Sequence, residues 1–105
     1  MYDYTYVYEI LFEENVEEEM AKIRPFDGRR LLSAIHKQLG HQPAVETRHR
    51  KILRGVKPPF KNVPPLWELR AGEYRVFYDV NQEDKKVHVR AVRHKPPHKT
   101  TEVIL

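Results

Sequence analysis

The sequence contains no cysteine, which excludes disulfide bonds and metal sites built on thiolates. No apolar stretch approaches the roughly 20 residues that a membrane-spanning helix needs, and none has the form of a signal-peptide core. We therefore expect a cytoplasmic protein without a membrane partner.

Motifs of several common enzyme classes are also missing. The sequence has no glycine-rich phosphate loop and no GxSxG motif, so it gives no support to nucleotide hydrolysis or to a serine triad. Its six histidines lack the HExxH spacing and any other tight ligand spacing. We accordingly expect no metal ion and no cofactor.

Charged residues are abundant and unevenly placed. The 105 residues, of which 40% are hydrophobic and 32% charged, fit a single domain spanning residues 1–105 with a net charge of +4. Acidic residues gather between Glu9 and Glu19, whereas most lysines and arginines and all histidines lie from Arg29 to Lys99. This basic region fits an anionic partner such as nucleic acid, although a solvated basic surface would have the same composition.

The spacing of apolar residues predicts the secondary structure. Alternating aromatic and apolar residues predict a strand over Tyr4–Phe12. The capping residue Asn15 and the helical spacing after it predict a helix that ends at Pro25. A second helix is expected from the cap Asp27 to Gly40. The remaining expected elements are a loop from His41 to Pro65 and strands at Leu66–Arg70, Tyr74–Val80 and Lys86–Arg93.

This order, β-α-α-β-β-β, predicts an α+β fold in which two helices pack on one face of a twisted, mainly antiparallel sheet. Alternation sorts the last three strands into two faces. The face expected under the helices carries Trp67, Leu69, Tyr74, Val76, Tyr78, Val87, Val89 and Ala91. The face expected to be open carries Glu68, Arg70, Arg75, Phe77, His88, Arg90, Val92 and His94.

Arginine and phenylalanine side by side on an open sheet suit phosphate contacts and base stacking. A solvated outer face with cross-strand ion pairs, such as Glu68 with an arginine, is the alternative interpretation. His94 and His98 are candidates for proton transfer because imidazole titrates near neutral pH, although surface histidines without function are common.

The run from Trp67 to Tyr78, the segment Val87–Val92 and the pair His94–Lys95 together resemble the C-terminal sheet of RelE/ParE toxins. Upstream, Tyr8–Ile23 resembles the first strand and helix of that superfamily, and Arg48–Leu53 resembles the basic segment before its second strand. The resemblance covers most of the chain and implies a RelE-like fold. It also implies the toxin component of a type II toxin–antitoxin system.

Many toxins of this superfamily cleave mRNA on the ribosome without a metal, and others inhibit DNA gyrase. In the cleaving branch the ribose 2′-hydroxyl attacks the adjacent phosphate, which requires a base, an acid and cations that stabilise the charged transition state. By position, the resemblance makes Arg75 the transition-state arginine. Arg70 and the His94–Lys95 pair match basic positions near the active site, with His94 as a possible acid or base and Lys95 as a phosphate contact. The further substrate-binding candidates are Arg90, Arg93 and Phe77.

Two features depart from the ribosome-dependent nucleases of the superfamily. Glu68 stands where they have an active-site lysine, and no tyrosine follows His94. Glu68 is then either the base, as in nuclease branches that combine glutamate with histidine, or an inert ion-pair partner.

Three functions remain open from the sequence: a metal-independent endoribonuclease that cleaves mRNA at the ribosome, a ParE-like DNA gyrase inhibitor, and a non-catalytic antitoxin-binding protein. The partner expected in each case is a cognate antitoxin that forms an oligomer with the toxin. Its amphipathic or extended acidic segment is expected over the basic sheet face or in the groove beside the helices. The tyrosine-rich start is expected in the core, or else at a sheet edge that joins two copies.

Overall fold

The computed structural model describes residues 7–105, which form an α+β fold. In chain order the elements are β1 (Glu9–Phe12), α1 (Glu14–Ala21), α2 (Pro25–Leu39), β2 (Arg50–Leu53), β3 (Leu66–Ala71), β4 (Tyr74–Asn81), β5 (Lys86–His94) and α3 (Thr101–Ile104). None of the helices within this range has the length and apolar character needed to cross a membrane.

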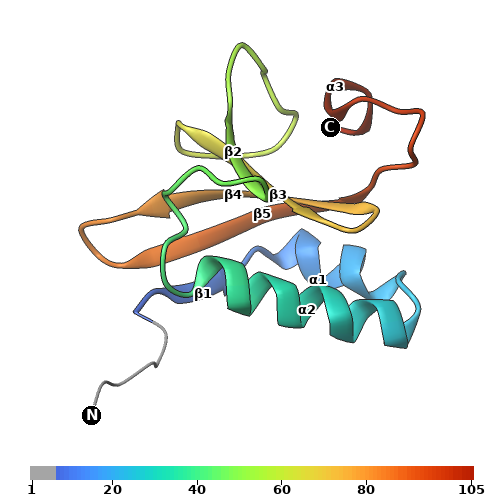
Figure 1. Ribbon diagram of the computed structural model, residues 1–105, viewed down its shortest axis with the longest axis horizontal. Coiled ribbons are helices and arrows are strands. Elements are labelled where there is room, and N and C mark those ends of the chain that lie inside the picture. The colour runs from blue at the N-terminus through green and yellow to red at the C-terminus, as the bar shows by residue number, and fades with distance from the viewer. Residues whose placement is uncertain (1–6) are drawn as a thin grey trace.

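The five strands form one sheet in the order β1-β5-β4-β3-β2. β1 runs parallel to β5 and the other neighbours are antiparallel. Figure 1 shows α1 and α2 together beneath the sheet, whereas α3 and the long connection after β2 lie on its other side. The predicted fold class, with both long helices on one face, is confirmed.

The main core lies between α2 and the sheet. The apolar stripe of α2, Leu31, Ile35 and Leu39, is buried against the helix-side residues of β3, β4 and β5. Trp67 and Tyr78 stack with their ring centroids 6.0 Å apart. The Tyr78 hydroxyl donates a hydrogen bond of 2.8 Å to the Pro43 carbonyl, so this buried polar group is satisfied. Burial raises the pKa of Tyr78 above its ordinary value.

The ends of the first three elements differ in detail from the predictions. Tyr2, Tyr4 and Tyr6 of the predicted first strand lie outside the described residues, and the strand itself spans Glu9–Phe12. Tyr8 is buried in the core, as expected. Asn15 and Asp27 lie inside their helices and do not cap them; α2 begins at Pro25, whose fixed φ suits the first helical position.

The predicted loop from His41 to Pro65 contains a strand. Residues Arg50–Leu53 pair with β3 as the edge strand β2, which is only four residues long. The side chains of Arg50 and Lys51 point to opposite sides of the sheet: Arg50 donates to the carbonyls of Val45 and Gln38, whereas Lys51 reaches Glu68. A strand this short leaves too few alternating positions to be detected by period alone.

A β-bulge corrects the predicted division of β5 into faces. Phe77 is opposite Ala91 but the next residue of β4, Tyr78, is opposite Val89, so Arg90 is an extra residue. Beyond the bulge every side chain changes face. Val92 therefore joins the helix-side core, whereas Ala91 lies on the other face. His94 also turns to the helix side, where its ring lies 5.3 Å from that of Tyr74.

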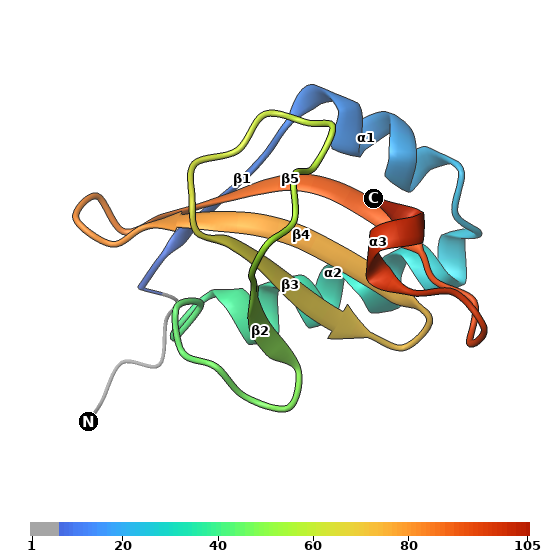
Figure 2. The same cartoon turned by 90° about the horizontal axis from the view of Figure 1, so that it is seen from above.

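The second face of the sheet is covered in part, in contrast to the prediction that it is open. A small cluster of Leu66, Phe77 and Ala91 is buried there, and the residues packed against it are Leu53, Phe60, Ile104 and Leu105. Phe77 is fully buried and so is not presented for base stacking. Figure 2, which looks onto this face, shows the connection after β2 and the C-terminal α3 lying over the sheet.

Candidate functional site

Three arginines on neighbouring strands lie directly opposite one another. Arg70 of β3 pairs with Arg75 of β4, and Arg75 pairs with Arg93 of β5. Directly opposite side chains in a sheet have Cβ atoms only about 5 Å apart, and like charges in such pairs destabilise the sheet. We refer to Arg70, Arg75 and Arg93 as the arginine row. An anion bound at the row would reduce this repulsion.

Arg75 is the central and most enclosed member of the row, with 7% of its surface exposed. Its Nη1 donates hydrogen bonds to the carbonyls of Gly72, at 2.8 Å, and Tyr74, at 2.9 Å. Burial lowers the pKa of the Arg75 guanidinium; the negative charge of Glu68 opposes this shift and the positive charge of Arg70 adds to it. The guanidinium remains charged at neutral pH because its ordinary pKa is so high.

The two outer members of the row differ in their contacts. Arg70 is exposed, and within residues 7–105 no carboxylate forms an ion pair with it. Arg93 is half-buried, forms a 2.6 Å ion pair with Glu19 of α1 and lies 5.9 Å from the centre of the Phe60 ring. Arg70 is thus the member most open to a ligand.

Glu68 lies one row away on the same face, and it is almost completely buried. One carboxylate oxygen accepts a 2.7 Å hydrogen bond from the Thr101 hydroxyl of α3. The other lies 3.5 Å from the Nζ of Lys51 on β2. Lys51 was not among the candidates from the sequence, because the pairing that brings it to Glu68 depends on the strand that the pattern did not predict.

Glu68 and His94, the candidate base and the candidate acid or base that the sequence placed on one open face, are not brought together. The bulge at Arg90 turns His94 to the helix side, where its Nε2 lies 3.4 Å from an oxygen of Glu73. Glu68 faces the opposite side. Lys95, the next residue, donates its backbone N–H to the Glu73 carbonyl and lies just after β5.

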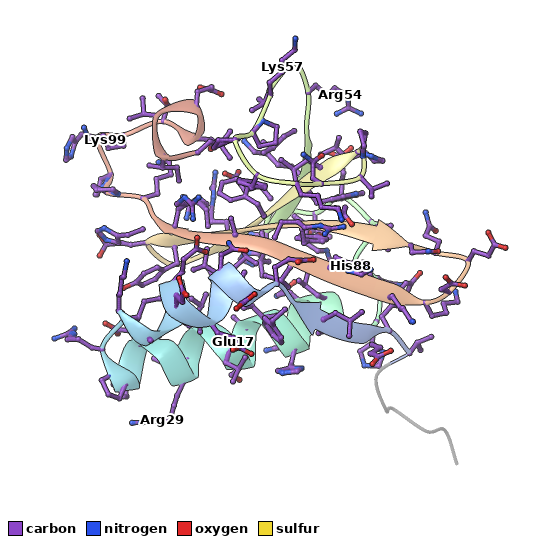
Figure 3. The ribbon with its side chains drawn as sticks, turned by 180° about the vertical axis from the view of Figure 1, so that it is seen from behind. Glu17, Arg29, Arg54, Lys57, His88 and Lys99 are labelled. Carbon is purple, nitrogen blue, oxygen red and sulfur yellow. The ribbon has the colours of Figure 1, made fainter. Side chains whose placement is uncertain are left out.

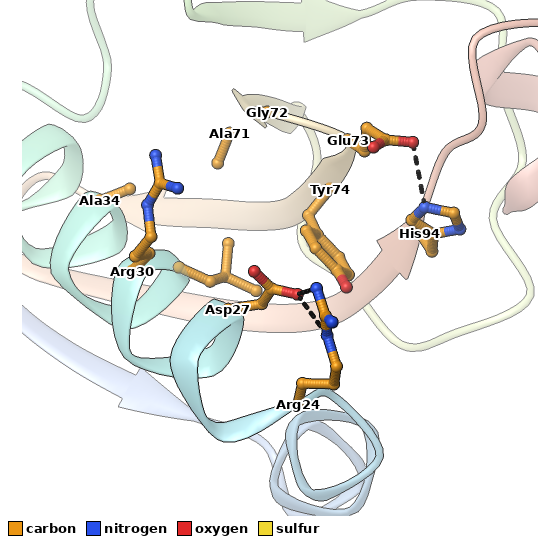
Figure 4. A pocket seen from close by; sticks show the side chains of 10 residues that line it. Arg24, Asp27, Arg30, Ala34, Ala71, Gly72, Glu73, Tyr74 and His94 are labelled. Carbon is orange, nitrogen blue, oxygen red and sulfur yellow. Dashed lines mark hydrogen bonds and ion pairs between the residues drawn. The ribbon is translucent and has the colours of Figure 1, made fainter.

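His94 lines a cavity of about 630 Å³ between α2 and the turn that joins β3 to β4. Its apolar lining includes Leu31, Ala34 and Tyr74. Figure 4 shows the Arg24–Asp27 ion pair and the contact between Glu73 and His94 at this cavity. The cavity therefore lies across the sheet from the arginine row and does not form part of it.

Arg90 has a structural position in the sheet. Its side chain is 6% exposed and forms ion pairs with Asp79, at 2.7 Å, and with Glu13, at 2.6 Å. A second hydrogen bond to Asp79, at 3.1 Å, makes that pairing bidentate. The predicted role of Arg90 as a substrate contact is therefore not supported by its geometry.

Solved structures of toxin–antitoxin proteins are similar to this chain. The isolated E. coli RelE toxin is 26% identical, with a TM-score of 0.62 over 91% of this chain and 89% of that chain. A chain of the archaeal RelE–RelB complex from Pyrococcus horikoshii is 23% identical, with a TM-score of 0.66; the match covers 90% of this chain and 99% of that chain. A chain of the RelBE2 complex from Mycobacterium tuberculosis is 22% identical, with a TM-score of 0.67; the match covers 84% of this chain and 98% of that chain. These likenesses confirm the RelE-like fold.

No curated protein sequence matches the chain. The family model described as ParE toxin of type II toxin-antitoxin system, parDE, matches residues 10–95, which include both long helices and all of β1–β5 except Glu9 at the start of β1. That match spans well over half of the chain and agrees with the similar structures. The chain therefore belongs to the ParE toxin family of the RelE/ParE superfamily and is the toxin component of a type II toxin–antitoxin system.

Proposed function

We propose that this toxin is a metal-independent endoribonuclease that cleaves mRNA at the ribosome, and hence acts in the cytoplasm. The observation that carries this proposal is the arginine row, in which three arginines lie in register across three neighbouring strands. Their mutual repulsion is relieved when a phosphodiester binds, and it is relieved further as negative charge builds up in the transition state.

The proposed reaction starts when a base removes the proton of the ribose 2′-hydroxyl and the 2′-oxygen attacks the adjacent phosphorus. The bond from phosphorus to the 5′-oxygen then breaks, and an acid protonates that oxygen. The products are a 2′,3′-cyclic phosphate and a 5′-hydroxyl. Arg75 and Arg70 supply the positive charge that stabilises the pentavalent phosphorane. Glu68, on the same face, stays the candidate base, whereas His94 lies on the wrong face to act with it.

Substrate access in this proposal requires the C-terminal segment to move. Thr101, Ile104 and Leu105 lie over the face that holds Glu68 and Phe77, and Arg75 is itself buried. The helix α3 has only four residues, so its displacement costs less than the unfolding of a longer element.

A second candidate function is inhibition of DNA gyrase without RNA cleavage. It is favoured by the match to the ParE toxin model and by the enclosure of Glu68, both of whose carboxylate oxygens have partners in the fold. It is also favoured by the burial of Phe77, which removes the predicted stacking surface.

We further propose a cognate antitoxin as the partner, since two of the similar structures are toxin–antitoxin complexes. An acidic antitoxin segment that covers the arginine row would neutralise its charge and exclude phosphate at the same time. The assembly expected is an oligomer of toxin and antitoxin.

Induction of the toxin in growing cells, followed by primer-extension mapping of abundant mRNAs and gel analysis of plasmid supercoiling, tests the two functions. The nuclease proposal predicts new mRNA ends within minutes of induction and unchanged supercoiling. Loss of negative supercoiling with intact mRNA would instead establish the gyrase function.

A further inference from the structure

A lysine side chain lies beside the arginine row on the same face of the sheet. β2 pairs with β3 so that Lys51 is directly opposite Glu68, and its Nζ lies 3.5 Å from Oε1 of that residue. Arg70 is two positions further along β3, which places its row about 7 Å away. One nucleic-acid backbone crossing this face can therefore contact both Lys51 and Arg70.

The Lys51 ammonium is open to solvent, whereas its partner is not. The side chain of Lys51 is 51% exposed and that of Glu68 is 2% exposed. Their 3.5 Å separation exceeds the about 2.7–2.9 Å of a tight charge-assisted hydrogen bond. An ammonium has three N–H donors, so Lys51 retains donors for a ligand after it has paired with Glu68.

Arg90 shows the contrasting arrangement, a buried cation whose charge is paired with carboxylates of the fold. Its side chain is 6% exposed, and its ion pairs with Asp79 and Glu13 are 2.7 and 2.6 Å long. Lys51 differs from Arg90 in both exposure and distance. The Lys51–Glu68 pair therefore leaves a positive charge at the surface, and the Arg90 pairs do not.

The position of Lys51 also lets a ligand reach it without displacement of the C-terminal segment. α3 holds Glu68 from the side of β4 and β5 through the Thr101 hydroxyl. Lys51 approaches from β2, the opposite edge of the sheet. Figure 2 shows the ribbon of α3 away from the edge strand β2, and Thr101 and Lys51 contact different oxygens of the Glu68 carboxylate. Lys51 can thus make a first contact before the face is uncovered.

We propose that Lys51 binds a phosphate of the RNA substrate and that Glu68, the candidate base, also holds the Lys51 ammonium toward the arginine row. This inference rests on the proposed endoribonuclease function and extends it by a residue on β2. A phosphate bound between Lys51 and Arg70 would lie at the edge of the sheet, and the neighbouring phosphate would lie toward Arg75.

The test compares Lys51→Gln, which can still donate a hydrogen bond to Glu68, with Lys51→Arg, which keeps the charge. The matched control is Lys37→Gln, since Lys37 is an exposed lysine in the last turn of α2 on the other side of the sheet. Two quantities are measured: the affinity for a short single-stranded RNA as a function of salt, and the rate of mRNA cleavage in a cell-free translation reaction. Thermal melts establish that each variant is folded.

We expect Lys51→Gln to reduce the slope of log affinity against log salt by about 0.7, the value for one lost phosphate contact on a single strand. The cleavage rate should fall about 10- to 100-fold, as expected when one charge-assisted hydrogen bond is lost. Lys51→Arg should keep the slope, and Lys37→Gln should match the original protein in both measurements.

The role of Lys51 would be overturned if Lys51→Gln changed neither the salt dependence of RNA affinity nor the rate of cleavage. If Arg75→Ala had lost cleavage in the same experiment, the proposed function would still stand. An equal loss in Lys37→Gln would assign the effect to net charge and would also overturn it. If the original protein neither cleaves mRNA nor binds RNA in a salt-dependent manner, the proposed function fails and this inference fails with it.

Discussion

Arg75 and Arg90 are both buried arginines of the central strands, but their contacts give them different roles. Arg90 has two carboxylate partners, whereas both side-chain hydrogen bonds of Arg75 go to backbone carbonyls. A buried charge that is fully paired within the fold is a structural element. Arg75 instead lies in register with two other arginines and forms no ion pair within the described residues 7–105.

We predict that Arg90→Met lowers the free energy of unfolding by about 3–5 kcal/mol, because Asp79 would be left as a buried carboxylate without its cation. Urea denaturation followed by circular dichroism measures this change. Arg70→Met is the matched control and should stay within about 0.5 kcal/mol, since Arg70 is exposed. Equal stabilities of the two variants would contradict the structural role of Arg90.

We predict that Arg75→Ala abolishes growth inhibition in cells while the protein remains folded. The substitution removes two hydrogen bonds to carbonyls, but it also removes the repulsion from Arg70 and Arg93. Arg75→Lys keeps the charge but loses the planar fork and should restore toxicity only in part. Growth curves after induction measure the toxicity of each variant, and thermal melts show whether it is folded. Full toxicity of a folded Arg75→Ala protein would remove this residue from the site.

At the level of elements, α3 contacts the candidate site through the hydrogen bond from Thr101 to Glu68, and Ile104 packs near that bond against the cluster that holds Phe77. Thr101→Val keeps the shape of the residue but leaves an oxygen of the buried Glu68 without its donor. We predict a loss of about 1–3 kcal/mol in the free energy of unfolding. Thr101→Ser keeps the hydroxyl, so its free energy of unfolding should fall much less. Chemical denaturation of both variants decides whether this contact holds α3 in place, and two variants with the same stability as the original protein would refute it.

The strands of the C-terminal half could be predicted from the sequence because each has at least six residues with clear alternation. The observed β3, β4 and β5 cover all three predicted ranges and extend each by one residue. β2 could not be predicted, since four residues between polar and proline-rich stretches have no measurable period. α3 is equally short and follows a pair of prolines, so it has no detectable helical spacing.

The candidate site could be predicted only in part, and the bulge at Arg90 is the main reason. Alternation correctly placed Glu68, Arg70 and Arg75 on one face, because β3 and β4 are regular there. An extra residue in β5 reverses the faces from Ala91 onward and brings Arg93 into the row in place of His94. Local sequence does not reveal a bulge that depends on pairing with a distant strand.

For the whole molecule, the positive charge is not confined to one side. Figure 3 shows Arg54 and Lys57 on the side of the arginine row, Arg29 beneath α2, and Glu17 on the outer surface of α1. A net charge of +4 therefore does not by itself determine where an acidic partner binds. The arginine row is distinguished by the direct register of its three residues across neighbouring strands rather than by their number.

We predict that Arg70→Glu weakens binding of the antitoxin at least about tenfold, because a like charge would then face its acidic segment. Arg29→Glu makes the same charge change on the outer face of α2 and should have a much smaller effect. Titration calorimetry at two salt concentrations measures both, and the affinity of the original protein should fall as salt rises. A larger effect of Arg29→Glu would place the antitoxin on the helix side.

The central claim is that the arginine row promotes attack of a ribose 2′-oxygen on its neighbouring phosphate. The most direct measurement incubates the purified toxin with ribosomes programmed with a defined mRNA and determines the fragment masses. We predict one or more cuts whose 5′ fragments end in a 2′,3′-cyclic phosphate, with no cleavage by Arg75→Ala or at a mapped position made 2′-deoxy. Intact mRNA, or cleavage that continues at the 2′-deoxy position, would contradict this account.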